Sequence, residues 1–173
     1  MILQGKRALI TGGSSGIGFA IAEAMLAKGA KVAITGRRPD VLTEAAKQLR
    51  QGGRSVESIA ADVSTEKGRQ TTLKLALEKL GGLDILVNNA GGVRAGRLED
   101  TTEAEIRAMI EVDLVAPILL TRREWLYRRS GQARTASSSM SPPASRLLRR
   151  HSMRPTPASK VVWRSSANPF AGN

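Results

Sequence analysis

The stretch TGGSSGIG, residues Thr11–Gly18, decides how this chain is expected to fold. It lies between a short apolar run, Lys6–Thr11, which predicts a buried strand, and Ile17–Lys28, where apolar residues recur at helical spacing. Glycines at such a junction permit a tight turn and let backbone N–H groups approach a phosphate, which the helix dipole also attracts. A plain strand–helix turn is the alternative reading, so the rest of the chain must decide between them.

Strand and helix patterns continue to alternate after this turn. The predicted strands are 6–11, 31–35, 55–63 and 83–91, and the predicted helices are 17–28, 40–49, 66–80 and 102–120. Thr102 with Glu105 three residues later predicts a capping box at the start of the last helix. This order predicts an α/β fold with a doubly wound parallel sheet.

The net charge of +12 is unevenly distributed. Residues 1–121 hold 16 Lys+Arg and 14 Asp+Glu, whereas residues 122–173 hold 11 Lys+Arg and one acid, Glu124. The second part also contains five of the seven prolines and ten serines. We therefore expect two regions, with 122–173 forming a disordered basic tail.

Composition also excludes several classes of protein. With zero cysteines the chain has no disulfide framework and no thiolate metal site, and we expect no metal. No apolar run reaches about 18 residues, so no membrane span is expected. The N-terminus lacks the charged-then-apolar order of a signal peptide, so a cytoplasmic location is expected.

Four ordered stretches in residues 1–121 resemble the short-chain dehydrogenase/reductase family. They are TGGSSGIG, ADV at 61–63, NNAG at 88–91 and EVDLVAPILLTR at 111–122, where Asp113 stands in place of the family's usual asparagine. The resemblance implies a Rossmann fold of the family's type, truncated here, and hydride transfer between a nicotinamide cofactor and a carbonyl or secondary alcohol. The cofactor contacts it implies are Thr11, Gly12, Ser14, Ser15, Gly16, Ile17, Gly18, Asp62, Val63, Asn89, Ala90 and Gly91.

The end of the second predicted strand indicates which nicotinamide cofactor is bound. A carboxylate there would bond the ribose hydroxyls of NAD and repel a 2′-phosphate. This chain has Gly36 followed by Arg37 and Arg38, and paired guanidinium donors suit a phosphate. NADP is therefore favoured over NAD, with a solvated basic loop as the alternative.

The resemblance ends before the residues that would carry the chemistry. The family has a fifth strand with an active-site serine, then a tyrosine four residues before a lysine. Here Lys160 is present, but Thr156 stands where the tyrosine is expected. Asp113 and Lys160 are therefore the only catalytic candidates in the chain as written. Without a catalytic tyrosine, the chain as written is expected to have no reductase activity.

The tail gives the missing motifs when it is back-translated and read in a shifted frame. With codons chosen from the degenerate code and one nucleotide added in front, SSMSPPAS, at 138–145, can be read as IVNVSSGI, and HSMRPT, at 151–156, as PFYATY. We interpret 122–173 as a frame-shifted remnant of strand five, the active-site segment and helix five. A four-stranded fragment would then have an unpaired edge beside its fourth strand.

Two functions other than that of an oxidoreductase are compatible with the sequence. One is a non-catalytic nucleotide-binding remnant. Another is nucleic-acid binding through the arginines of the tail, which is disfavoured because few aromatic residues accompany them. The resemblance implies a small carbonyl or alcohol substrate and a homo-oligomeric parent, with no membrane partner.

Overall fold

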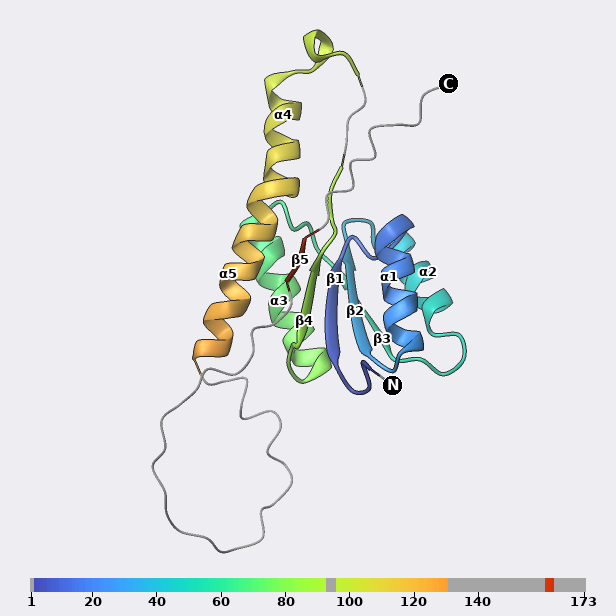
Figure 1. Cartoon of the computed structure of the whole chain (residues 1–173). Helices are drawn as coiled ribbons and strands as arrows, with labels where there is room; N and C mark the ends of the chain where they lie inside the picture. Colours follow the sequence, from blue (N-terminus) through green and yellow to red (C-terminus); the bar gives the residue numbers. More distant parts are fainter. Residues whose placement is uncertain (1, 93–95, 131–160, 164–173) are drawn as a thin grey trace, which may run out of the picture.

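The computed structural model describes residues 2–92, 96–130 and 161–163 (Figure 1). It contains a five-stranded sheet in the order β3-β2-β1-β4-β5. The strands are β1 Arg7–Thr11, β2 Lys31–Gly36, β3 Val56–Ala60, β4 Ile85–Asn88 and β5 Val161–Trp163. All neighbouring pairs are parallel, so the predicted doubly wound parallel sheet is confirmed.

Both faces of the sheet are buried, as its continuous apolar strands require. In β1, Ala8, Leu9 and Ile10 are all 0% exposed. Leu9 pairs in register with Ala33 of β2 and Leu86 of β4, which places it at the centre of the sheet.

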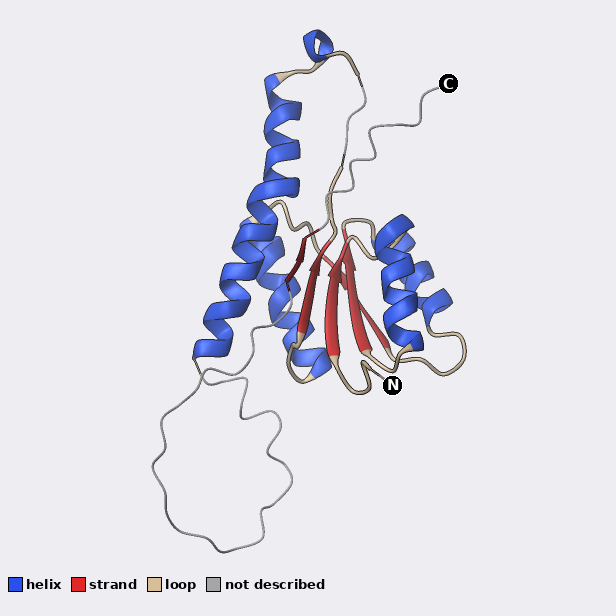
Figure 2. Ribbon diagram, viewed as in Figure 1, coloured by secondary structure: helices blue, strands red, loops and turns tan. Residues whose placement is uncertain are grey.

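Helices form a layer on each face (Figure 2). Helices α1 Gly16–Ala27 and α2 Pro39–Leu49 cover one face, and α3 Glu66–Leu80 and α5 Ala116–Arg129 cover the other. Successive strand residues therefore enter different cores: Ile10 packs with the α1–α2 cluster and Leu9 with the α3–α5 cluster. The predicted positions of the first three helices are confirmed.

The fourth helical segment differs from its prediction. It consists of α4 Glu103–Ile110, a π-helical turn η2 Glu111–Val115, and α5. The capping box of Thr102 and Glu105 is confirmed. The predicted end near residue 120 is wrong, because the helix continues to Arg129. Its last turns are held by the buried carboxylate of Glu124, which pairs with Arg128, and by Arg128, which donates to the Leu83 carbonyl at 2.6 Å.

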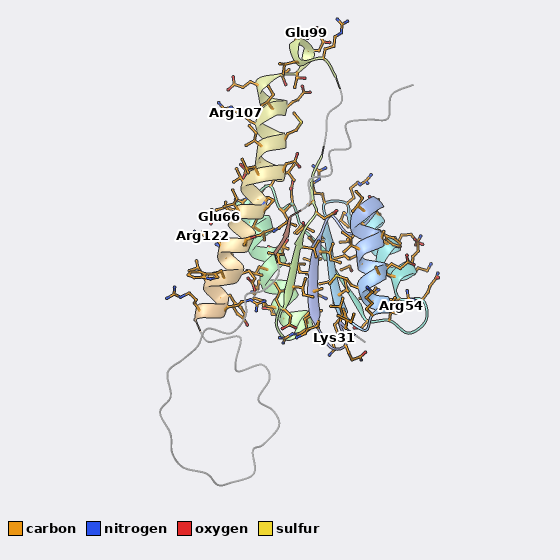
Figure 3. The ribbon with its side chains drawn as sticks, viewed as in Figure 1. Lys31, Arg54, Glu66, Glu99, Arg107 and Arg122 are labelled. Carbon is orange, nitrogen blue, oxygen red and sulfur yellow. The ribbon has the colours of Figure 1, made fainter. Side chains whose placement is uncertain are left out.

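The α4 end of this segment projects beyond the sheet (Figure 1). The short helix η1 Leu98–Asp100 precedes it, and Figure 3 shows Glu99 and Arg107 on this projecting part. None of the helices in the described part of the chain has both the length and the apolarity needed to cross a bilayer.

The expectation of an unpaired sheet edge beside the fourth strand is wrong. Backbone of β5 pairs with β4 in the register Leu86–Val161, Val87–Val162 and Asn88–Trp163. This run of β-branched and aromatic residues favours a strand, although the surrounding composition predicted a tail without one. The segments 138–145 and 151–156, together with Lys160, lie outside the described residues.

Candidate functional site

A cavity of about 660 Å³ opens at the carboxyl ends of the strands. Gly12 follows β1, Gly36 ends β2, Ala61 follows β3 and Asn89 follows β4, and all four line it. Strands β2 and β3 extend the sheet to one side of β1, whereas β4 and β5 extend it to the other. Chain connections diverge at this point, which is where open α/β sheets bind their ligands.

Most of the predicted cofactor residues come together in this cavity. Those lining it are Gly12, Ser14, Ser15, Ile17, Arg37, Arg38, Asp62, Val63, Asn89, Ala90 and Gly91. Thr11, Gly16, Gly18 and Asp113 are not among its lining residues. Lys160 lies outside the described residues.

Thr11 lies beneath the cavity and joins two of its loops. Its side chain is 2% exposed, and its hydroxyl oxygen accepts hydrogen bonds from the backbone N–H groups of Asn89, at 3.0 Å, and Ala90, at 2.9 Å. In return, the side-chain nitrogen of Asn89, Nδ2, donates to the backbone carbonyls of Thr11, at 3.0 Å, and Gly12, at 3.2 Å. Thr11 therefore fixes the loop after β4 against the turn after β1.

Two glycines of the same motif allow that close approach. Gly12 has a φ of +65°, and a Cβ there would lie 2.8 Å from the Cα of Ala90. A Cβ at Gly18 would overlap the Gly12 carbonyl oxygen and the Asn89 amide nitrogen. Gly18 thus serves packing between the β1 and β4 loops without lining the cavity, whereas Gly12 does both.

The N-terminus of α1 faces the cavity with its first-turn amides available. The N-cap residue, Ser15, makes no side-chain capping hydrogen bond, and the first turn contains no acidic residue. Ser15 and Ile17 both line the cavity. Free N–H groups and the helix dipole make this corner suitable for an anion.

Two cations lie on the β2 side of the cavity. Arg37 and Arg38 are both exposed, and neither guanidinium group has a hydrogen-bond or ion-pair partner within the described ranges. Gly36, at the end of β2, provides no carboxylate to oppose an anion. Two unpaired guanidiniums beside a cavity are suited to bind a phosphate group.

Asp62 is held in a fixed orientation on the β3 side. Its Oδ1 accepts hydrogen bonds from the Ser64 backbone N–H, at 3.0 Å, and from the Ser64 hydroxyl, at 2.7 Å. Its other oxygen, Oδ2, has no hydrogen-bond partner in the part of the chain that the structure describes. Asp62 can therefore accept one further hydrogen bond from a ligand donor.

Asp113 lies in the π-helical turn η2, and π-turns are often found at functional sites. Its Oδ1 accepts a hydrogen bond from the backbone N–H of Gly92, a cavity residue, at 3.1 Å. The Asp113 carboxylate therefore links η2 to the loop after β4.

The sequence motifs did not predict that one wall of the cavity is formed by a helix. Glu105, Ala108, Met109 and Val112 line it, together with Thr35, Ala61 and Gly92. The four helical residues have the spacing i, i+3, i+4, i+7, which is the signature of one helix face and could have been used.

Comparison with known proteins identifies the class of this chain. The family model described as short chain dehydrogenase matches residues 6–142. The chain therefore belongs to the short chain dehydrogenase family, as its motifs indicated.

Two relatives illustrate the range of the family. The NADP-dependent (R)-specific alcohol dehydrogenase of Lentilactobacillus kefiri is 41% identical over 121 residues, which are 69% of this chain and 47% of the relative. The peroxisomal 2,4-dienoyl-CoA reductase of Arabidopsis thaliana is 34% identical over 138 residues, covering 80% of this chain and 46% of that protein.

Solved structures agree with this assignment. A short chain dehydrogenase from Burkholderia cenocepacia J2315, in complex with NADP, has a TM-score of 0.68 and 42% identity over 72% of this chain and 51% of its own. The L-sorbose reductase from Gluconobacter frateurii, complexed with NADPH and L-sorbose, has a TM-score of 0.69 and 35% identity over 75% of this chain and 49% of its own. The chain thus spans about half the length of the relatives that it matches.

Proposed function

We propose that the cavity binds NADP(H) and that the chain is the cofactor-binding part of a short-chain oxidoreductase. The observation that carries this is the pairing of an uncapped helix N-terminus with two unpartnered arginines around one cavity at the switch point. One corner suits a pyrophosphate and the other a 2′-phosphate. The NADP and NADPH complexes of the two solved relatives support the same choice of cofactor.

Each wall is assigned one part of the dinucleotide. The turn after β1 and the start of α1 would hold the pyrophosphate, with Arg37 and Arg38 on the ribose 2′-phosphate. Asp62 and Val63 would hold the adenine, and the loop after β4 would lie toward the nicotinamide. The proposed contacts on that loop are Asn89, Ala90 and Gly91.

Bound NADPH supplies a hydride, and reduction of a small carbonyl compound also needs a proton donor. The chain has one tyrosine, Tyr127, which lies in a groove between α3 and α5 and does not line the cavity. Thr156 has an aliphatic hydroxyl, a far weaker acid than a phenol, so it is not a substitute. We therefore propose cofactor binding without turnover for the chain as written.

We also propose that residues 122–173 derive from a shifted reading frame. The charge asymmetry and the hidden IVNVSSGI and PFYATY peptides support this. The coding DNA is expected to carry compensating single-base insertions or deletions around codons 122–173. A DNA sequence whose alternative frame lacks both peptides would overturn the proposal.

The binding and activity proposals are tested together on two proteins. One is the chain as written, and the other is a frame-restored version that includes Thr156→Tyr. Both are titrated with NADPH by fluorescence and assayed for NADPH oxidation over a panel of ketones and aldehydes. We expect both to bind and only the restored protein to turn over. Absence of NADPH binding would refute the cofactor site, and turnover by the unaltered chain would refute its inactivity.

A further inference from the structure

Arg69 of α3 is a buried cation that the proposed cofactor contacts do not use. The residue is 8% exposed and lies in the buried stripe of α3, next to Thr72 and Leu73. A guanidinium in such a position is costly unless it is fully paired. The role of Arg69 therefore depends on what its donors contact.

All side-chain hydrogen bonds of Arg69 to described residues come from one guanidinium nitrogen, Nη1. That nitrogen donates to the carbonyl oxygens of Val63, at 3.0 Å, and Ser64, at 2.7 Å. It also pairs with Oε1 of Glu111 at 3.1 Å. Arg69 thus connects the loop after β3 to the first residue of η2, 42 positions along the chain from it.

Each of these two segments contributes a residue to the lining of the cavity. Val63 lines it directly, and Ser64 holds Asp62 through two hydrogen bonds to Oδ1. In η2, Glu111 immediately precedes Val112, which also lines the cavity. Arg69 itself does not line the cavity, so it can affect the site only through the two segments that it connects.

We propose that Arg69 is a positioning residue, which preorganises the adenine-side wall by tying the Asp62–Ser64 loop to η2. This rests on the proposed function, because it concerns the same cavity. With the link in place, the loop is ordered before the cofactor arrives, and binding does not have to order it. Without the link, part of the binding free energy is used to order the loop, and affinity for the adenosine half of the cofactor falls.

The arrangement of the acceptors predicts which substitution is tolerated. Because the three acceptors face one nitrogen, the compact ammonium of lysine, with its three donors, can satisfy the same groups. Arg69→Lys should therefore preserve the link, whereas Arg69→Met should remove it while keeping most of the apolar stem.

A matched control lies at the other end of the same helix. Lys79 of α3 pairs with Glu57 of β3 at 3.1 Å, and neither residue lines the cavity. Lys79→Met therefore breaks an ion pair between α3 and the β3 region without loosening a cavity wall.

The experiment measures the affinity of the full chain for NADPH and for 2′,5′-ADP by calorimetry, with thermal melting of each variant. Arg69→Met is expected to weaken both ligands equally, by about tenfold, which is the scale of ordering costs at a binding site. Arg69→Lys and Lys79→Met are expected to stay within about twofold of the unaltered chain, which marks no resolved change in binding free energy.

The outcomes separate this inference from the proposed function. If the unaltered chain binds neither ligand, the proposed function fails. If it binds both and Arg69→Met, still melting cooperatively, keeps its 2′,5′-ADP affinity, the positioning role is wrong. If Arg69→Met does not fold, Glu111→Ala decides, because it removes only the link to η2. An unchanged 2′,5′-ADP affinity in that variant would overturn the inference, and a several-fold loss would support it.

Discussion

The two ends of the sheet use arginine in opposite ways. At the amino end, the guanidinium of Arg7 forms a two-point contact with Asp84, with Nε–Oδ2 at 2.9 Å and Nη2–Oδ1 at 3.0 Å. Its remaining nitrogen donates to the Gly81 carbonyl at 2.7 Å. At the carboxyl end, the guanidinium groups of Arg37 and Arg38 have no hydrogen-bond or ion-pair partner within the described ranges.

This difference separates cations that stabilise the fold from cations that can receive a ligand. The hydrogen bond with Asp84 raises the pKa of Arg7, and the same hydrogen bond lowers the pKa of Asp84. The pair connects the start of β1 to the residue before β4. The unpaired arginines beside the cavity contribute no comparable contact, which leaves their donors available for a phosphate.

The largest effect is expected at the carboxyl end, from Gly18→Val. A side chain there overlaps the Gly12 carbonyl and the Asn89 amide, so the β1 and β4 loops must separate. We expect NADPH affinity to fall by at least about a hundredfold and unfolding free energy to fall by about 1–3 kcal/mol. Calorimetry and urea denaturation measure the two quantities.

Gly96→Ala is the matched control, because a Cβ there would have no neighbour within 4 Å. It should leave both quantities unchanged. Unaltered NADPH affinity in Gly18→Val would contradict the packing role of that glycine.

At the amino end, Asp84→Ala should affect stability and not binding. It leaves Arg7 half-buried without its carboxylate, which is expected to cost about 1–2 kcal/mol of unfolding free energy. Affinity for NADPH should remain unchanged, because neither Arg7 nor Asp84 lines the cavity. A parallel loss of NADPH affinity would show that the two ends of the sheet are coupled.

The same pair predicts a pH dependence. Because the folded pKa of Asp84 is lowered, its contribution is fully present above its unfolded pKa of about 4 and is lost as pH falls through the lower folded value. The raised pKa of Arg7 matters only above about pH 12. Urea midpoints of the unaltered chain and Asp84→Asn should therefore differ at neutral pH and converge under strongly acidic conditions. A constant difference down to acidic pH would exclude the pair as its cause.

The smallest effect is expected on the projecting α4 segment. Arg107 bonds Glu103 at 2.8 Å, but both side chains are 76% exposed, so solvent screens the pair. Arg107→Ala should change unfolding free energy by less than about 0.5 kcal/mol. A change above 1 kcal/mol, measured in urea, would mean that this segment packs against something beyond the described residues.

Local patterns predicted the fold because they act over short distances. Glycines after the first strand, alternating apolar runs and the Thr102–Glu105 box each depend on neighbouring residues, and the corresponding elements form as expected. The continuation of α5 was missed because its support is tertiary. Glu124 is buried against Arg128, which in turn reaches the Leu83 carbonyl 45 positions away.

The motifs predicted most of the residues that line the cavity, but not which motif residues lie behind its surface. Thr11 and Gly18, which belong to the predicted motif, do not line the cavity and instead hold the β1 and β4 loops together. That distinction depends on the distance between the loops after β1 and β4, which cannot be predicted from local sequence patterns. Strand β5 was missed for a similar reason, since its three residues pair with β4, which is distant in the sequence.

The central claim is that the unpaired arginines at the carboxyl end select NADP(H). The most direct test is calorimetric titration of the full chain with NADPH and with NADH, repeated on Arg37→Asp. We predict that the unaltered chain binds NADPH at least about tenfold more tightly, and that Arg37→Asp reverses the order because a carboxylate repels the 2′-phosphate and accepts the ribose hydroxyls. Equal affinities in the unaltered chain, or an unchanged preference in Arg37→Asp, would contradict it.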